Sequence, residues 1–172
     1  MFKILLKRIV VIGSLILIFF VLQVGLFSNL SIANVSPNLL IILVASIGFM
    51  RGSKEGVVAG FFCGLMVDIV SGGIFGFYAL LYLVLGYVNG LFHEIYHPDD
   101  FRLPILLIAG TSFSNSLVIY FFRFLLRGEF RFFFFLNNII MLELIYTVAI
   151  SIFLYRFILY INNKMLRGSE FD

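Results

Sequence analysis

Glycine recurs at every fourth position in one apolar stretch, and this spacing limits how the chain can fold. The repeat begins at Gly52 and continues to Gly64, and the same step then leads to Asp68. On a helix with 3.6 residues per turn, a four-residue step turns by about 40°, so these residues form a slowly winding stripe. Because glycine has no side chain, such a stripe lets a second helix backbone approach closely. The expected helix-packing positions are Gly52, Gly56, Gly60, Gly64, Gly72 and Gly76.

The composition indicates that this close packing takes place in a membrane. Of the 172 residues, 62% are hydrophobic and only 12% are charged, which is more apolar surface than a soluble domain can bury. We therefore predict an all-α integral membrane protein with one polytopic domain over residues 1–172. The single cysteine excludes an internal disulfide, and nothing in the sequence indicates nucleic-acid binding or a cofactor.

The apolar segments predict a compact bundle of about six transmembrane helices. The expected spans are at about residues 9–27, 38–50, 55–70, 74–92, 103–122 and 138–160. The first is long enough to cross a bilayer core of about 30 Å, and a cleaved signal peptide is the alternative. The second is short, so it either crosses by thinning the bilayer or is part of a re-entrant pair.

The positions of the basic residues predict the orientation. With six spans and a cytoplasmic N-terminus, nine of the twelve Lys and Arg residues lie on the cytoplasmic side: Lys3, Lys7, Arg8, Arg51, Lys54, Arg102, Arg156, Lys164 and Arg167. The positive-inside rule then places both termini in the cytoplasm. The exceptions are Arg123, Arg127 and Arg131, which alternate with phenylalanines outside. That segment is either an interfacial anchor or a docking surface for a partner.

Four polar side chains fall in the outer half of this topology. They are Gln23, Asp68, Arg123 and Glu143. Asp68 lies about 21 Å along its helix from Lys54, at a depth where a carboxylate needs a partner or water. We hypothesise that Asp68 or Glu143 pairs with Arg123 or Arg127. In the alternative, Asp68 reaches the headgroups and Glu143 snorkels outward.

Asn115 belongs to a polar run in the fifth span and is a further expected buried polar or partner-coupling residue.

The residues His93-Glu94-Ile95-Tyr96-His97 match the H-E-x-x-H pattern of helical zinc sites. In such sites the two histidines bind metal and the glutamate activates water. Pro98 ends the helix directly after His97, and no convincing third ligand follows. The alternative is a helix C-terminus at which histidine interacts favourably with the dipole, so no metal site is expected.

Several short elements between Pro37 and Gly90 resemble the rod shape-determining protein MreD family. This resemblance covers about a third of the chain. The elements are Pro37-Asn38-Leu39-Leu40, Arg51-Gly52, Gly56, Gly60, Gly64, Asp68, Ser71-Gly72-Gly73, Gly76 and Tyr78-Ala79-Leu80-Leu81.

The resemblance implies a non-enzymatic scaffold of the bacterial cell-elongation machinery. MreD-like proteins partner the bitopic protein MreC and act with RodA, a class B penicillin-binding transpeptidase and, indirectly, MreB filaments. Together these proteins direct lateral peptidoglycan synthesis. The family is also similar in span pattern to the substrate-binding subunits of energy-coupling-factor transporters. Contact with membrane lipids is implied by the composition itself.

Two other functions stay open from the residues alone. The first is a vitamin-type small-molecule binding subunit of a transporter, with an outward pocket near Asp68, Asn115 and Glu143. Such subunits usually carry an Ala-x-x-x-Ala docking face in the first span, and residues 9–27 contain no alanine. The second is an intramembrane zinc protease that uses His93, Glu94 and His97.

Overall fold

The computed structural model describes residues 2–27, 37–72, 74–95, 102–127 and 140–168, and within these ranges it is helical with no β-strand. The elements are α1 (Phe2–Leu22) with a π-helical end η1 (Gln23–Phe27), α2 (Leu39–Arg51), α3 (Ser53–Ser71), α4 (Phe77–Leu91) with a 3-10 end η2 (Phe92–Ile95), α5 (Arg102–Arg127) and α7 (Met141–Gly168). The predicted all-α class is confirmed for these residues.

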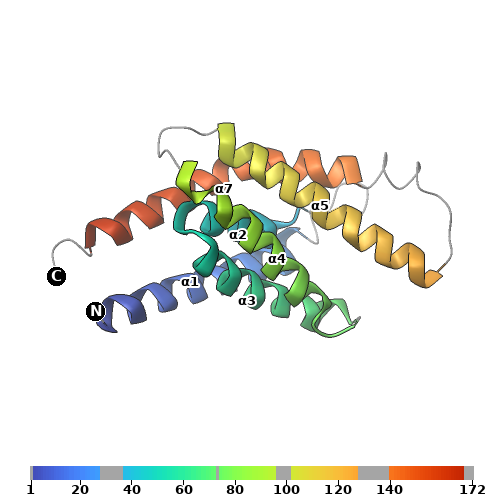
Figure 1. Cartoon of the computed structure of the whole chain (residues 1–172), viewed down its shortest axis with the longest axis horizontal. Coiled ribbons are helices and arrows are strands. Elements are labelled where there is room, and N and C mark those ends of the chain that lie inside the picture. Colours follow the sequence, from blue (N-terminus) through green and yellow to red (C-terminus); the bar gives the residue numbers. More distant parts are fainter. Residues whose placement is uncertain (1, 28–36, 73, 96–101, 128–139, 169–172) are drawn as a thin grey trace.

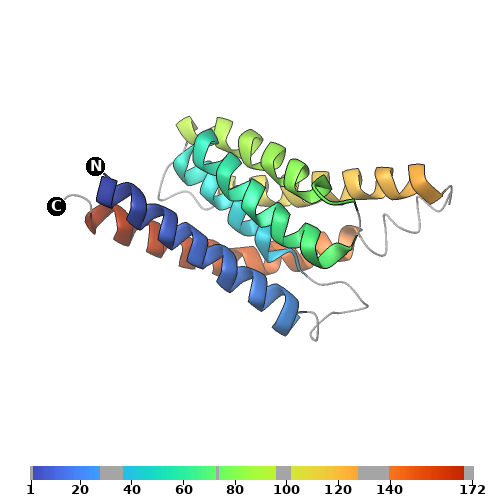
Figure 2. The same ribbon diagram turned by 90° about the horizontal axis from the view of Figure 1, so that it is seen from below.

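The short helix α2 lies at the centre of the bundle (Figures 1 and 2). Helices α1, α3, α4, α5 and α7 all contact it. Every residue from Leu39 to Met50 is buried, and Met50, at the end of this run, is only 5% exposed. A helix that is apolar on all sides is typical of a fully buried helix. The second predicted span is therefore the core around which the other helices pack.

Three of the described helical stretches are long and apolar enough to cross a membrane. They are Phe77–Ile95, Arg102–Phe122 and Met141–Lys164. Two shorter apolar helices, Ile9–Gly25 and Leu39–Arg51, accompany them. The first residues of α1 and the last residues of α7 lie at the same end of the bundle (Figures 1 and 2). The membrane character is thus supported, and the count of six spans stays a prediction.

Helices α3 and α4 form an antiparallel hairpin whose backbones touch. Gly56, Gly60 and Gly64 all face α4. A Cβ atom added at Gly56 would lie 2.5 Å from an α4 carbonyl oxygen. At Gly60 and Gly64 it would overlap the backbone at Tyr82 and Tyr78. The glycine stripe therefore removes the side-chain layer that normally separates two helices.

Glycines outside the predicted stripe complete this contact. A Cβ atom on Gly86 would overlap the backbone of Gly56, and one on Gly90 would overlap that of Ser53. From α2, a Cβ on Gly48 would lie 2.8 Å from the carbonyl oxygen of Gly86. Three helices thus meet closely at Gly86.

The remaining predicted packing glycines have other surroundings. At Gly52, between α2 and α3, an added Cβ would make an ordinary contact 3.5 Å from the ring of His93. At Gly72 and Gly76 it would meet nothing within 4 Å. These two have φ angles of 62° and 97°, which disfavour residues with a side chain. The structure therefore gives Gly72 and Gly76 a turn-forming role in place of the expected packing role.

We expect Gly60→Ala to lower the stability of the purified protein by about 1–3 kcal/mol, because its methyl group must push α4 away from α3. Thermal unfolding in mild detergent measures this change. Gly110→Ala on α5 is the matched control, because a Cβ there meets nothing within 4 Å. Equal stability of the two variants would contradict the contact.

Candidate functional site at the α3–α4 hairpin

Asp68 joins the two helices of the hairpin. Its Oδ2 atom accepts hydrogen bonds from the backbone N–H groups of Gly76 at 3.1 Å and Ala79 at 2.9 Å. Its Oδ1 atom accepts from the N–H of Tyr78 at 3.0 Å. The residue is only 4% exposed. A carboxylate near the end of α3 thus caps the N-terminus of α4.

This cap accounts for the N–H groups that a helix start leaves without intrahelical partners. Asp68 accepts from three of them, and the N–H of Phe77 donates to the carbonyl oxygen of Ile74 at 3.2 Å. The negative charge also interacts favourably with the positive end of the helix dipole. The buried carboxylate of Asp68 therefore has backbone hydrogen-bond donors inside the bundle for both of its oxygens.

A second polar cluster surrounds the start of α2. The side chain of Asn38 accepts from the third backbone N–H of its own helix at 3.2 Å, and its Nδ2 donates to the Tyr82 hydroxyl at 2.8 Å. The N–H of Asn38 donates to Oγ1 of Thr147 at 3.3 Å. The N–H of Leu40 donates to Oε1 of Gln23 at 3.1 Å. Residues from η1, α4 and α7 thus meet at one end of the buried helix.

Helix α5 contributes its polar run to the interior. Its Thr111 is hydrogen-bonded to Asn89 of α4, with 2.8 Å between Oγ1 and Nδ2. Its Ser116 Oγ donates to Oε2 of Glu143 on α7 at 3.0 Å. Oγ of Ser112 and Oδ1 of Asn115 are buried and have no hydrogen-bond partner among the described residues. Asn115 is thus buried as expected.

The predicted pairing of Asp68 or Glu143 with an arginine stays a prediction. The side chains of Arg123 and Arg127 lie outside the described residues. Asp68 binds the start of α4 and Glu143 binds Ser116, so the two acids have different partners.

The last two residues of the H-E-x-x-H sequence, Tyr96 and His97, also lie outside the described residues. His93 is in η2, and its Nδ1 atom donates to the carbonyl oxygen of Phe49 at 3.0 Å. That carbonyl belongs to the last turn of α2. An interaction of histidine with a helix C-terminus was expected. The helix that His93 contacts is α2, and not the helix that leads into η2.

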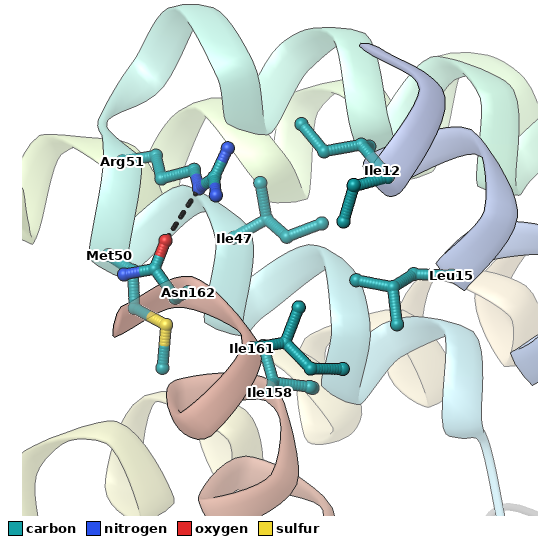
Figure 3. Close-up of a pocket in the computed structure, with 9 residues that line it drawn as sticks. Ile12, Leu15, Ile47, Met50, Arg51, Ile158, Ile161 and Asn162 are labelled. Atoms are coloured by element: carbon teal, nitrogen blue, oxygen red, sulfur yellow. Dashed lines mark hydrogen bonds between the residues drawn. The ribbon is translucent and has the colours of Figure 1, made fainter. Parts of the chain in front are cut away.

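The opposite end of α2 carries a third polar group. Arg51 donates from Nε to Oδ1 of Asn162 on α7 at 2.8 Å and forms an ion pair with Glu55 at 3.0 Å. Figure 3 shows this arginine at the end of a hollow lined by apolar side chains. The central helix is thus tied to α7 at both of its ends.

Most of these partners were not identified from the sequence. The N-cap role of Asn38 could have been predicted, because asparagine is favoured at the position before an apolar helix. Thr147 and Asn162 lie 109 and 111 residues from their partners. No local pattern in a single sequence relates positions that far apart.

The apolar helical bundle with its internally bonded polar groups defines the class of helical integral membrane proteins. Residues 3–165 match the family model described as rod shape-determining protein MreD. The chain therefore belongs to the MreD family. Searches of the curated proteins and of the solved structures found no match. The likeness to energy-coupling-factor transporter subunits stays a prediction.

We expect Asp68→Ala to lower stability by at least about 2 kcal/mol, because it leaves buried N–H groups of α4 unpaired. Asp68→Asn is expected to fall between this variant and wild type, because its one side-chain oxygen accepts fewer of these bonds. Ser71→Ala, at an exposed position of the same helix end, is the control and is expected to change stability by less than about 0.5 kcal/mol. Thermal unfolding in detergent separates the four proteins. A fully stable Asp68→Ala variant would refute the capping role.

Proposed function

We propose that this protein is a non-enzymatic membrane scaffold of the bacterial cell-elongation machinery. In this role it binds an MreC-like bitopic membrane protein and helps direct lateral peptidoglycan synthesis. The match to the MreD family over residues 3–165 is the observation that carries the proposal. RodA, a class B penicillin-binding transpeptidase and, indirectly, MreB filaments are the further proposed partners.

The interior of the bundle supports a scaffold role. Helices α2, α3 and α4 are held together by backbone contacts at Gly56, Gly60 and Gly86 and by the Asp68 cap. Close van der Waals packing and internally satisfied polar groups give a stable body in a hydrocarbon solvent. A stable body of this kind suits a protein that positions partners.

The outer surface offers the area that partners need. Large apolar side chains are exposed on α1, α4, α5 and α7. We place the protein in the bacterial inner membrane with both termini in the cytoplasm. The shared position of the α1 start and the α7 end supports an even number of crossings (Figure 2). The basic, phenylalanine-rich segment after Arg123 is the proposed docking segment on the outer side.

The transporter alternative has less support. Its expected pocket included Asp68, whose carboxylate oxygens are bonded to the start of α4. The hollow in Figure 3 lies instead beside Arg51, at the other end of α2.

We expect affinity purification of the tagged chain from its native membrane, in mild detergent, to recover an MreC-like bitopic protein. Mass spectrometry identifies the partners, and elemental analysis of the same sample measures zinc. An ATPase-linked transport module, or one zinc per chain, would overturn the scaffold role.

A second set of variants tests whether partner binding depends on the close packing of α3 and α4. Gly64→Leu is expected to lose the partner while the chain still inserts into the membrane, because the leucine forces α3 and α4 apart. Glu94→Ala is expected to keep both partner recovery and cell shape, because Glu94 is exposed and a scaffold needs no general base. Loss of rod shape in the Glu94→Ala strain would instead favour the zinc protease.

A further inference from the structure

The acidic side chain of Glu143 contacts Ser116 in the interior of the bundle. Glu143 on α7 and Ser116 on α5 both lie inside candidate membrane spans. The rings of Phe77 and Phe122 are 4.9 Å apart, which places that part of α5 beside the start of α4. Ser116 precedes Phe122 by six residues, or about 9 Å along the helix. Glu143 is half-buried and Ser116 is only 7% exposed, so the pair lies inside the bundle and not at its end.

The surroundings of Glu143 offer few groups that could stabilise a negative charge. Within the described part of the chain, the Ser116 hydroxyl is its one hydrogen-bond partner. No Lys or Arg occurs within one turn of either residue along its helix, and α2 has no charged side chain before its last residue. Tyr82 of α4 interacts electrostatically with Glu143. Tyr120 and Tyr146 lie one turn from the pair, on α5 and α7. A tyrosine supplies no positive charge.

Asp68 shows how differently this bundle surrounds its other buried acid. The two oxygens of Asp68 accept hydrogen bonds from three backbone N–H groups. Glu143 has only one neutral hydroxyl beside it among the described residues. An ionised carboxylate with so few donors is costly inside a membrane, whereas a neutral carboxylic acid is much less so.

The number of hydrogen atoms on Ser116 also favours the neutral acid. Its Oγ lies 3.0 Å from the carbonyl oxygen of Ser112 and 3.0 Å from Oε2 of Glu143. A serine hydroxyl has one hydrogen, and a carbonyl and a carboxylate can only accept, so that hydrogen would have to serve both contacts. When Glu143 carries a proton, its own O–H donates to Ser116, and the Ser116 hydrogen goes to the carbonyl. Both contacts are then complete hydrogen bonds.

Other buried hydroxyls of the bundle follow the second arrangement. Those of Ser46, Thr111 and Ser151 each donate to a carbonyl oxygen three or four residues earlier in the same helix, at 2.6, 2.6 and 2.7 Å. The Thr111 oxygen at the same time accepts from Nδ2 of Asn89 at 2.8 Å. Ser116 has the same geometry, with Glu143 in the position of the donor.

We infer that Glu143 is a proton-binding site inside the bundle, where the neutral carboxylic acid donates a hydrogen bond to Ser116. The ligand of this site is a proton, and α5 and α7 are joined through it. The inference does not depend on which proteins the scaffold binds. The arginine pair hypothesised for Glu143 requires an ionised carboxylate, so the two hypotheses predict different results.

The test compares infrared spectra of the purified full chain and its Glu143→Gln variant in detergent at neutral pH. A carboxylic acid has a C=O stretching band that is separate from the bands of a carboxylate. We expect this acid band in wild type and its loss in Glu143→Gln. Glu94→Gln is the matched control, because Glu94 is exposed, and it is expected to keep the band.

A second pair of variants tests the partner of the acid. Ser116→Ala is expected to move the acid band to higher frequency, because the carboxylic acid loses the oxygen to which it donates. Ser114→Ala is the control, because Ser114 is exposed on the same helix, and it is expected to leave the band in place.

Thermal unfolding in detergent tests whether the neutral form is the one that stabilises the bundle. Glu143→Gln is expected to melt within about 2 °C of wild type, because its amide N–H donates to the same Ser116 oxygen. Glu143→Ala has no such donor and is expected to melt at least about 4 °C lower.

Three results would each overturn the inference. The first is an acid band that is unchanged in Glu143→Gln. The second is an acid band at the same frequency in wild type and a folded Ser116→Ala variant. The third is a Glu143→Gln variant as unstable as Glu143→Ala, which would indicate that the charge of Glu143 stabilises the bundle, as in an arginine pair.

Discussion

Backbone atoms of α3 and α4 touch because glycine replaces side chains on both helices, and the other interactions of the hairpin follow from this distance. The contact runs from Gly64 to Gly56 on α3 and continues through Gly86 to α2. With the two helices so close, the short side chain of Asp68 reaches the N–H groups of the residue before α4 and of its first turn. A bulkier stripe would separate the helices and leave both the carboxylate and those N–H groups without partners, which is costly in a membrane. The hydrogen bonds of Asp68 thus depend on the close packing of α3 against α4.

The buried helix α2 gives the bundle its second organising element. All of its residues from Leu39 to Met50 are buried, so its apolar side chains contact protein and not lipid. Polar groups at its two ends, Asn38 and Arg51, connect it to α7 through Thr147 and Asn162. Because each end of α2 has a hydrogen bond to α7, these two bonds together fix the position of α2 along α7. Helices α2 and α7 are thus held together at both ends of the central helix.

The prediction of tight packing came from a property that a single sequence displays, the four-residue spacing of Gly56, Gly60 and Gly64. The need of Asp68 for a partner was likewise predictable, because an acid at that depth is costly when unpaired. The partner itself was not predictable. The hypothesised pairing of Asp68 or Glu143 with an arginine stays a prediction, because the side chains of Arg123 and Arg127 lie outside the described residues. The structure shows the Asp68 carboxylate accepting from backbone N–H groups eight to eleven residues along the chain. That solution depends on the turn at Gly72 and Gly76 bringing the start of α4 back to the end of α3.

The helical membrane class, the family and the closely packed helix face could all be predicted from the amino-acid sequence. These follow from composition, short motifs and periodicity, which are local or additive properties of the chain. Only the tertiary contacts show which helix is central and which groups form hydrogen bonds with Asp68, Asn38 and Arg51. These depend on contacts between residues far apart in the chain, such as Arg51 and Asn162. No local pattern encodes such contacts, because many helix arrangements bury the same apolar faces and only packing and hydrogen-bond geometry select one.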